Sequence, residues 1–130
     1  MKVDRKKKIK DTLCGCENCS NGDKYFEWLQ EIGKDLKFDE NLNSLLAFFN
    51  ALGNKERLTI LKALKNKERC VCELEAILDK SQPSISHHLR ELEKVGLIRG
   101  WKKGKYTYYT LLREEFKGCI ANLNKEFSFE

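Results

Sequence analysis

The chain has 130 residues and a formal net charge of +5 at pH 7, and 41% of its residues are hydrophobic. This length corresponds to one domain, and the apolar content suffices for a modest core, which excludes a chain that is disordered throughout. The longest apolar run, Leu45–Phe49, is far shorter than the roughly 20 residues of a transmembrane helix. No apolar stretch follows the basic N-terminus, so we expect neither a secretory signal nor a membrane span.

The net charge lies entirely in the first ten residues, which carry six basic side chains and one acidic side chain. The remaining residues hold 19 basic and 19 acidic groups and sum to zero. A positive total therefore does not by itself indicate nucleic-acid binding, and the charge has to be assigned to elements.

Residues 1–22 show little apolar periodicity, and we expect a flexible, basic, cysteine-rich arm there. Residues 23–130 are expected to form the folded domain. Apolar side chains at helical spacing predict helices from Asp23 to about Leu36, over residues 40–52, and after a capping Asn54.

Two further helices are predicted close together, one over about Val71–Leu78 and one that Ser81 caps and that ends near Val95. Residues 97–101 and 105–111 then alternate like the two strands of a hairpin, and a last apolar stripe predicts a final helix. This order indicates a mainly α fold with a β-hairpin, a winged helix–turn–helix. The first and last helices carry apolar stripes without a partner in so small a domain, so we expect them to form a dimer interface.

The second helix of this pair and the hairpin carry a local charge of +4 over residues 81–110, as expected of a surface that faces phosphates. Polar side chains on the helix can reach base edges or phosphates, and the hairpin lysines can reach phosphates. The candidates for DNA contacts are Gln82, Ser84, Ser86, His87, Arg90, Lys102, Lys103 and Lys105. An ordinary solvated face is the alternative. His88 lies nearer the apolar stripe, where we expect a hydrogen-bonded residue at the edge of the core.

Six cysteines, without a visible export signal, indicate a reducing, cytoplasmic compartment and metal or redox sites rather than structural disulfides. Cys70 and Cys72 begin the first helix of the pair, and two thiolates do not complete the usual four ligands of zinc-like metals. The arm offers Cys14, Cys16 and Cys19. Thiolates favour soft cations such as Zn, Cd, Pb or Cu(I), and no organic cofactor is expected. We expect Cys119 to be a packing residue.

Other interpretations of the cysteines stay open. Cys70 and Cys72 are small enough to be buried as ordinary hydrophobic residues, and the same thiols suit a redox switch that works through disulfides. A structural zinc site in the arm is a further possibility. A thiol oxidoreductase using Cys16 and Cys19 is disfavoured because no βαβ pattern surrounds them, so we expect no enzyme.

Three segments together resemble the ArsR/SmtB family of metalloregulatory repressors. Ala51–Leu61 is similar to the helix that precedes the helix–turn–helix in this family, and Glu68–Leu74 (ERCVCEL) resembles its cysteine metal-binding motif. Ser81–Leu92 (SQPSISHHLREL) resembles its recognition helix, and Gly96–Tyr109 its wing. The resemblance implies a homodimer that binds operator DNA when metal-free and releases the DNA on binding metal.

The segment Asp11–Cys19, preceded by lysines, looks like the arm of the CadC branch of this family, which senses Cd, Pb and Zn. In that branch arm cysteines of one subunit join the Cys-x-Cys pair of the other, which implies a site of Cys70 and Cys72 with some of Cys14, Cys16 and Cys19. The arsenic-sensing branch often has a third thiol after the pair. Here that position is Glu75, so As(III) would need an arm cysteine. The family's second site, on the last helix, is predicted to be absent or vestigial because that helix contains no histidine.

Overall fold

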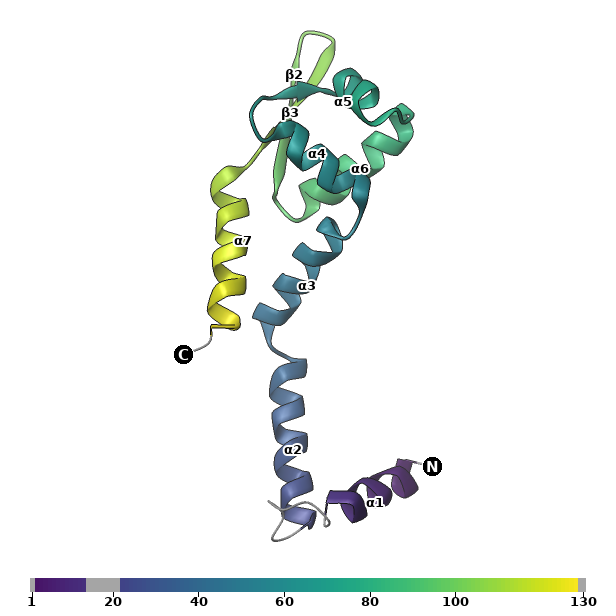
Figure 1. Ribbon diagram of the computed structural model, residues 1–130, viewed down its shortest axis with the longest axis vertical. Helices are drawn as coiled ribbons and strands as arrows, with labels where there is room; N and C mark the ends of the chain where they lie inside the picture. The colour runs from purple at the N-terminus through teal and green to yellow at the C-terminus, as the bar shows by residue number, and fades with distance from the viewer. Residues whose placement is uncertain (1, 14–21, 129–130) are drawn as a thin grey trace. The chain divides into compact units, whose positions relative to one another are not determined.

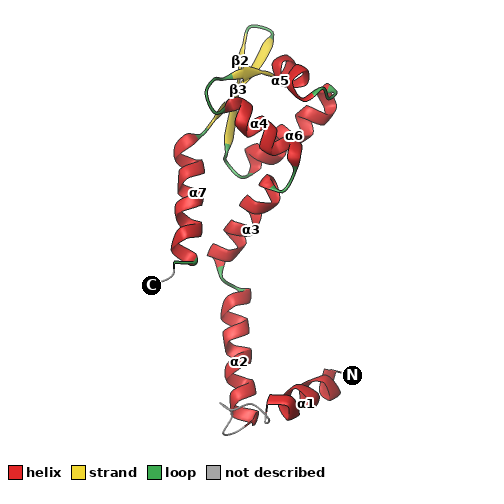
Figure 2. Cartoon of the chain, in the orientation of Figure 1, coloured by secondary structure: helices red, strands yellow, loops and turns green. Residues whose placement is uncertain are grey.

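The computed structural model describes residues 2–13 and 22–128 (Figure 1). Helices dominate, with one short strand before the helix pair and a hairpin after it (Figure 2). In chain order the elements are α1 (Lys2–Leu13), α2 (Gly22–Lys37), α3 (Glu40–Leu52), α4 (Lys55–Leu64), β1 (Arg69–Cys70), α5 (Val71–Leu78), α6 (Gln82–Lys94), β2 (Ile98–Lys103), β3 (Tyr106–Leu111) and α7 (Arg113–Glu126). Two compact units, Met1–Glu40 and Asn41–Glu130, make up the chain. Within the described residues, no helix is long and apolar enough to span a membrane.

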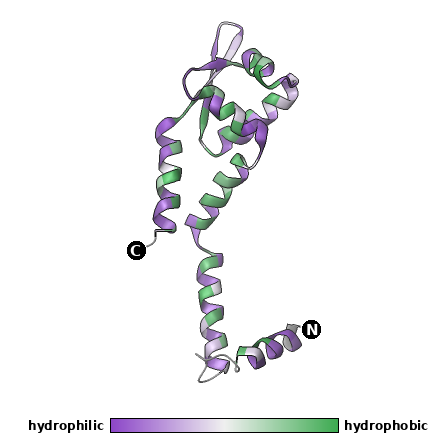
Figure 3. Ribbon diagram, in the orientation of Figure 1, coloured by the Kyte–Doolittle hydropathy of each residue, from purple (hydrophilic) through white to green (hydrophobic). Residues whose placement is uncertain are grey.

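The first unit contains α1 and α2. Helix α1 was not predicted, because lysines favour helix but provide no apolar stripe, and the ribbon of α1 is largely hydrophilic (Figure 3). Lys10 connects the two helices. Its Nζ lies 3.2 Å from a carboxylate oxygen of Asp23 and 5.2 Å from the ring centre of the buried Phe26. The division predicted between arm and domain, after residue 22, falls inside this unit and stays a prediction.

The second unit has one hydrophobic core beneath the helix pair and the hairpin. Its most buried large side chains come from α4, α5, α6 and the residue before β2, and each contributes about 1.5–3 kcal/mol by leaving water. They are Ile60, Leu74, Ile85, Leu89, Leu92 and Leu97. The apolar stripe predicted for the second helix of the pair is therefore the buried face of α6.

Local sequence signals place the helix ends in this unit. Asn54 caps α4 as predicted, since its side-chain oxygen accepts the N–H of Arg57 at 3.1 Å. Asp79 ends α5 with a left-handed φ of 53°. Ser81 is the N-cap of α6, as predicted, but it acts through its backbone: its carbonyl accepts the N–H of Ile85 at 3.0 Å, and its hydroxyl makes no capping bond.

The sheet has three antiparallel strands in the order β1-β3-β2. The hairpin β2–β3 was predicted, whereas the two-residue β1 was not. Directly opposite residues in such a sheet point to the same face, so two rows of side chains cross it. The Tyr109 row consists of Arg69, Tyr109 and Gly100, and the Tyr108 row consists of Cys70, Tyr108 and Trp101. Tyr109 packs against the core. The predicted winged helix–turn–helix fold is confirmed.

The Tyr109 row predicts a specific requirement for glycine at position 100. A Cβ on Gly100 would lie 2.7 Å from Cε1 of Tyr109. We expect Gly100→Ala to lower the free energy of unfolding by about 1–3 kcal/mol, because the ring must leave its packed position. Urea denaturation measures this. Gly118→Ala in α7 is the control: its Cβ meets no atom within 4 Å, and we expect a gain of about 0.5–1 kcal/mol. A Gly100→Ala protein as stable as the parent would contradict the packing.

Candidate functional site

The thiol pair lies where the sheet meets the helix pair. Cys70 is the last residue of β1 and the N-cap of α5, with φ −81° and ψ 163°, and it is buried. Cys72 is exposed in the first turn of α5. On a regular helix these side chains would point in opposite directions. Because Cys70 is extended, the two thiols instead come within hydrogen-bonding reach of each other. A shared ligand therefore needs no distortion of the helix.

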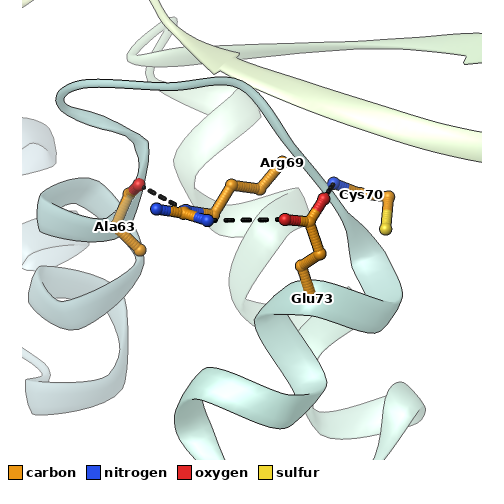
Figure 4. Close-up of polar contacts among 4 residues, drawn as sticks. All are labelled: Ala63, Arg69, Cys70 and Glu73. Carbon is orange, nitrogen blue, oxygen red and sulfur yellow. Dashed lines mark hydrogen bonds and ion pairs between the residues drawn. The ribbon is translucent and has the colours of Figure 1, made fainter.

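A polar network fixes the backbone of Cys70 (Figure 4). Oε1 of Glu73 accepts the N–H of Cys70 at 3.1 Å, and Oε2 lies 3.4 Å from Nη1 of Arg69. Nε of Arg69 donates to the carbonyl of Ala63, near the end of α4, at 2.8 Å. The start of α5 is thus linked to α4 through two side chains. Sequence analysis missed this network, although the spacing of Cys70 and Glu73 is that of a capping box.

The same contacts set the protonation of the site. The N–H of Cys70 is the main cause that lowers the pKa of the Glu73 carboxyl. The hydrogen bond with the Cys72 thiol, followed by burial, raises the pKa of the Cys70 thiol. Burial, and then the negative charge of a nearby Cys70 thiolate, raises the pKa of Tyr108. Cys70 therefore holds its proton at neutral pH, and any cation that binds its sulfur has to displace that proton.

A cleft of about 260 Å³ opens beside the thiols and brings residues from four elements together. Its lining comes from the end of β1, from α5, from the first residue of α6 and from the hairpin. The lining residues are Cys70, Val71, Cys72, Glu75, Gln82, Lys105, Tyr106 and Thr107. Candidate metal ligands and two candidate DNA contacts, Gln82 and Lys105, thus share one hollow. The sequence motifs, taken separately, did not predict that the cysteine pair lies close to Gln82 and Lys105.

The other candidates for DNA contacts lie on α6 and the hairpin. Gln82, His87 and Arg90 are exposed, and Ser84 and Ser86 are half-buried. Nε2 of Gln82 donates to Oγ of Ser86 at 2.9 Å, so this pair is already ordered.

The hairpin lysines are all exposed, and two of them lie over aromatic rings. Nζ of Lys103 is 5.9 Å from the ring centre of Tyr108, and Nζ of Lys105 is 5.7 Å from that of Tyr106. Lys102, the third candidate lysine of the hairpin, is also exposed. Rings beneath the cations restrict the lysine side chains and keep their charges on the hairpin.

Three remaining predictions concern residues away from the cleft. His88 is half-buried at the core edge, but its Nδ1 has no hydrogen-bond partner among the described residues, contrary to the expected bond. Cys119 packs against the core, and burial raises its pKa. Cys14, Cys16 and Cys19 lie outside the described residues. Within residues 2–13 and 22–128, no group of three or more His, Cys, Asp or Glu side chains could hold a metal ion.

The network around Cys70 predicts an effect of Glu73 on stability. We expect Glu73→Ala to lower the free energy of unfolding at pH 7, because the N–H of Cys70 loses its acceptor. The folded pKa of Glu73 is depressed from its ordinary value of 4.5, so this contribution is present above that pH. It is lost as the pH falls through the folded pKa, and the difference between variant and parent should narrow there.

Urea denaturation between pH 7 and pH 3 measures this difference. Glu114→Ala is the control, since Glu114 is 87% exposed and pairs only loosely with Lys117 at 3.8 Å. We expect it to change stability by less than about 0.5 kcal/mol. A difference for Glu73→Ala that stays constant with pH would contradict the assigned hydrogen bond.

Comparison with known proteins identifies this arrangement. The family of bacterial regulatory proteins called the arsR family matches residues 54–99. An HTH-type transcriptional regulator of Methanocaldococcus jannaschii is 38% identical over 82 residues, which cover 62% of this chain and 92% of that one. The CadC homolog of Staphylococcus aureus, a cadmium resistance transcriptional regulatory protein, is 36% identical over 88 residues, covering 67% of this chain and 72% of that one.

A solved structure agrees with the sequence similarity. HlyU from Vibrio cholerae superimposes with a TM-score of 0.58 at 32% identity, covering 71% of this chain and all of that one. The matched segment 54–99 contains α4, β1, the helix pair and the start of β2, and it includes five of the eight residues that line the cleft. The chain belongs to the ArsR family of DNA-binding helix–turn–helix transcriptional regulators, and it is not an enzyme.

Proposed function

We propose that this protein is a metal-responsive repressor, which binds operator DNA as a dimer without metal and releases it on binding a thiophilic cation. The observation that carries the proposal is the cleft in which the Cys70–Cys72 pair meets Gln82 of α6 and Lys105 of the hairpin. One hollow thus joins the candidate effector site to the candidate DNA surface. The cadmium resistance function named for the CadC homolog supports a metal effector.

For the DNA surface, α6 is the recognition helix of a helix–turn–helix, whose N-terminal side chains enter the major groove. Gln82, Ser84, Ser86, His87 and Arg90 supply those contacts. The wing lysines Lys102, Lys103 and Lys105 contact phosphates. Lys103 and Lys105 lie over aromatic rings, so these two side chains lose less conformational freedom when they bind.

The donor set of the site fits a soft cation. Cys70 and Cys72 both line the cleft and are close enough for Cys72 to raise the pKa of Cys70, and thiolates select Cd, Pb, Zn or As(III) over hard cations. Some of Cys14, Cys16 and Cys19 complete the coordination. A bound cation would supply a bond that ties the arm to the start of α5.

The dimer interface uses the first predicted helix of the domain and the last one. Trp28 and Leu36 of α2 are 58% and 54% exposed, and Phe127, which directly follows α7, is 55% exposed. Ile120 of α7 is 38% exposed. Apolar side chains left this accessible favour association with a second copy.

Release of DNA follows from the position of the thiols. The proposal is that a cation on Cys70 and Cys72, together with its further ligands, occupies the hollow that Gln82 and Lys105 also line and displaces these two residues from the position that suits DNA. A coupling of about 1–3 kcal/mol, equivalent to about 5–150-fold in affinity, is enough for induction.

A thiol redox switch is the second candidate, favoured by the hydrogen-bonding contact between the Cys70 and Cys72 thiols. It uses the same cleft but requires oxidation in place of metal. It predicts DNA release by an oxidant when all metal is chelated.

The wing assignment is tested by charge. A duplex selected by the metal-free protein from random sequences serves as the operator. We expect replacement of Lys102, Lys103 and Lys105 by Gln to weaken binding to all duplexes about equally. The salt slope, which is the slope of the logarithm of the binding constant against the logarithm of the salt concentration, should fall in magnitude by about one per lysine. Fluorescence anisotropy over a series of salt concentrations measures the slope. Lys62, Lys65 and Lys117, exposed on α4 and α7, provide the matched triple variant, for which the slope should stay constant. An unchanged slope for the wing variant would exclude the wing contacts.

The metal response is tested in reducing buffer with Cd(II), Pb(II), Zn(II) and As(III). We expect at least one of them to weaken operator binding by about 5–150-fold in the parent. Cys70→Ser should abolish that response, because the buried sulfur is a central ligand. Cys119→Ser is the matched control and should respond like the parent.

Metal binding should also release protons, because the raised pKa of Cys70 keeps its thiol protonated. The affinity for metal should therefore fall as the pH is lowered, which calorimetry in buffers of different ionisation enthalpy measures. If no metal changes operator affinity, while an oxidant does so with metal chelated, the redox candidate replaces the metal proposal.

A further inference from the structure

The Tyr108 row connects the thiol site to the wing across the sheet. Cys70 of β1 lies opposite Tyr108 of β3, which in turn lies opposite Trp101 of β2. Opposite residues of neighbouring antiparallel strands have Cβ atoms about 4.5–5.5 Å apart on one face of the sheet. The Cys70 side chain is thus one strand away from an aromatic pair that belongs to the hairpin.

The aromatic pair is in contact with wing cations. The rings of Trp101 and Tyr108 stack, with centres 6.2 Å apart and planes inclined by 23°. Nζ of Lys103 lies 5.9 Å from the centre of the Tyr108 ring, and Cζ of Arg99 lies 6.0 Å from that of Trp101. Each ring therefore positions one positive charge on the wing.

The Tyr109 row on the opposite face differs in its freedom to move. Tyr109 packs against the core, and its ring occupies the space above Gly100. Close-packed interiors resist displacement, so this row is fixed. Tyr108 and Trp101 are half-buried and, unlike Tyr109, are not among the described residues that pack against the core, so a change in their orientation does not open the core.

We propose that Tyr108 and Trp101 are positioning residues, which transmit occupancy of the Cys70 sulfur to the wing cations Lys103 and Arg99. This inference rests on the proposed function and adds the path by which the thiol site acts on the wing. Cys70 is only 6% exposed and is paired with Tyr108 in the sheet, so the inference is that an atom bonded to its sulfur presses on the Tyr108 ring as well as entering the cleft. When that ring turns, the stacked Trp101 turns with it, and the two cations leave their positions.

The test separates coupling from binding. Cd(II) is the probe, the DNA is the selected duplex, and three quantities are measured: the affinity for Cd(II), and operator affinity with and without it. We expect Tyr108→Leu to bind Cd(II) with an affinity within about twofold of that of the parent. The ratio of its operator affinities without and with Cd(II) should be at least about fivefold smaller than the ratio for the parent. Tyr108→Phe keeps the ring and should retain the full response.

Thr110→Ala is the matched control. Thr110 lies on the same strand and the same face as Tyr108, but it is paired with Arg99 rather than with Cys70, and it does not line the thiol cleft. The inference predicts a normal Cd(II) response for this variant. Equal losses in Thr110→Ala and Tyr108→Leu would show a general effect of altering this face of the wing and would overturn it.

A spectroscopic readout tests the inference independently of DNA. The chain contains two tryptophans, Trp28 and Trp101, so Trp28→Phe leaves Trp101 as the sole reporter. We expect loading of Cys70, by Cd(II) or by an organomercurial that bonds single thiols, to change Trp101 emission. The change should be lost in a Trp28→Phe, Cys70→Ser protein and reduced in a Trp28→Phe, Tyr108→Leu protein.

The two proposals fail differently. If none of Cd(II), Pb(II), Zn(II) and As(III) weakens operator binding by the parent, the proposed function fails, and Trp101 emission still tests whether Cys70 acts on Trp101. Emission that stays constant while Cys70 is loaded overturns the inference whatever the effector is. A full response in Tyr108→Leu overturns it while leaving the proposed function intact.

Discussion

The position of Cys70 depends on its belonging to two elements at once. As the last residue of β1 it is paired with Tyr108 of the hairpin, and as the N-cap of α5 it begins the helix pair. Its N–H is bound by Glu73, which Arg69 connects to α4. Cys70 is therefore linked directly to the hairpin and to the start of the helix pair, and through Glu73 and Arg69 to α4. These links are the structural basis of the proposed coupling between the thiols and the DNA surface.

Sequence reasoning was most successful where the signal is local and repeated. The stripe Ile85, Leu89 and Leu92 is buried as its spacing indicated, and Asn54 caps α4 through its side chain. The hairpin followed from alternation between residues 97 and 111. These elements were sufficient for the winged helix–turn–helix fold, because each is specified within a short window.

Elements that depend on distant partners were not predictable in this way. Strand β1 has two residues and exists because it pairs with β3, about 40 residues later, so it has no period of its own. The Arg69–Glu73 network likewise needs the carbonyl of Ala63 in place. Helix α1 was missed for a different reason, since its stability comes from backbone propensity rather than from an apolar face. The cleft joins motifs that sequence analysis treated separately.

The unequal exposure of the two thiols orders their reactions in time. Cys72 is exposed to solvent, whereas Cys70 is buried. Under the proposed function, a soft cation or a competing small thiol therefore meets the Cys72 sulfur first and the Cys70 sulfur afterwards. The exposed thiol would then set how fast the cation is exchanged, and the buried thiol would limit how readily the cation leaves.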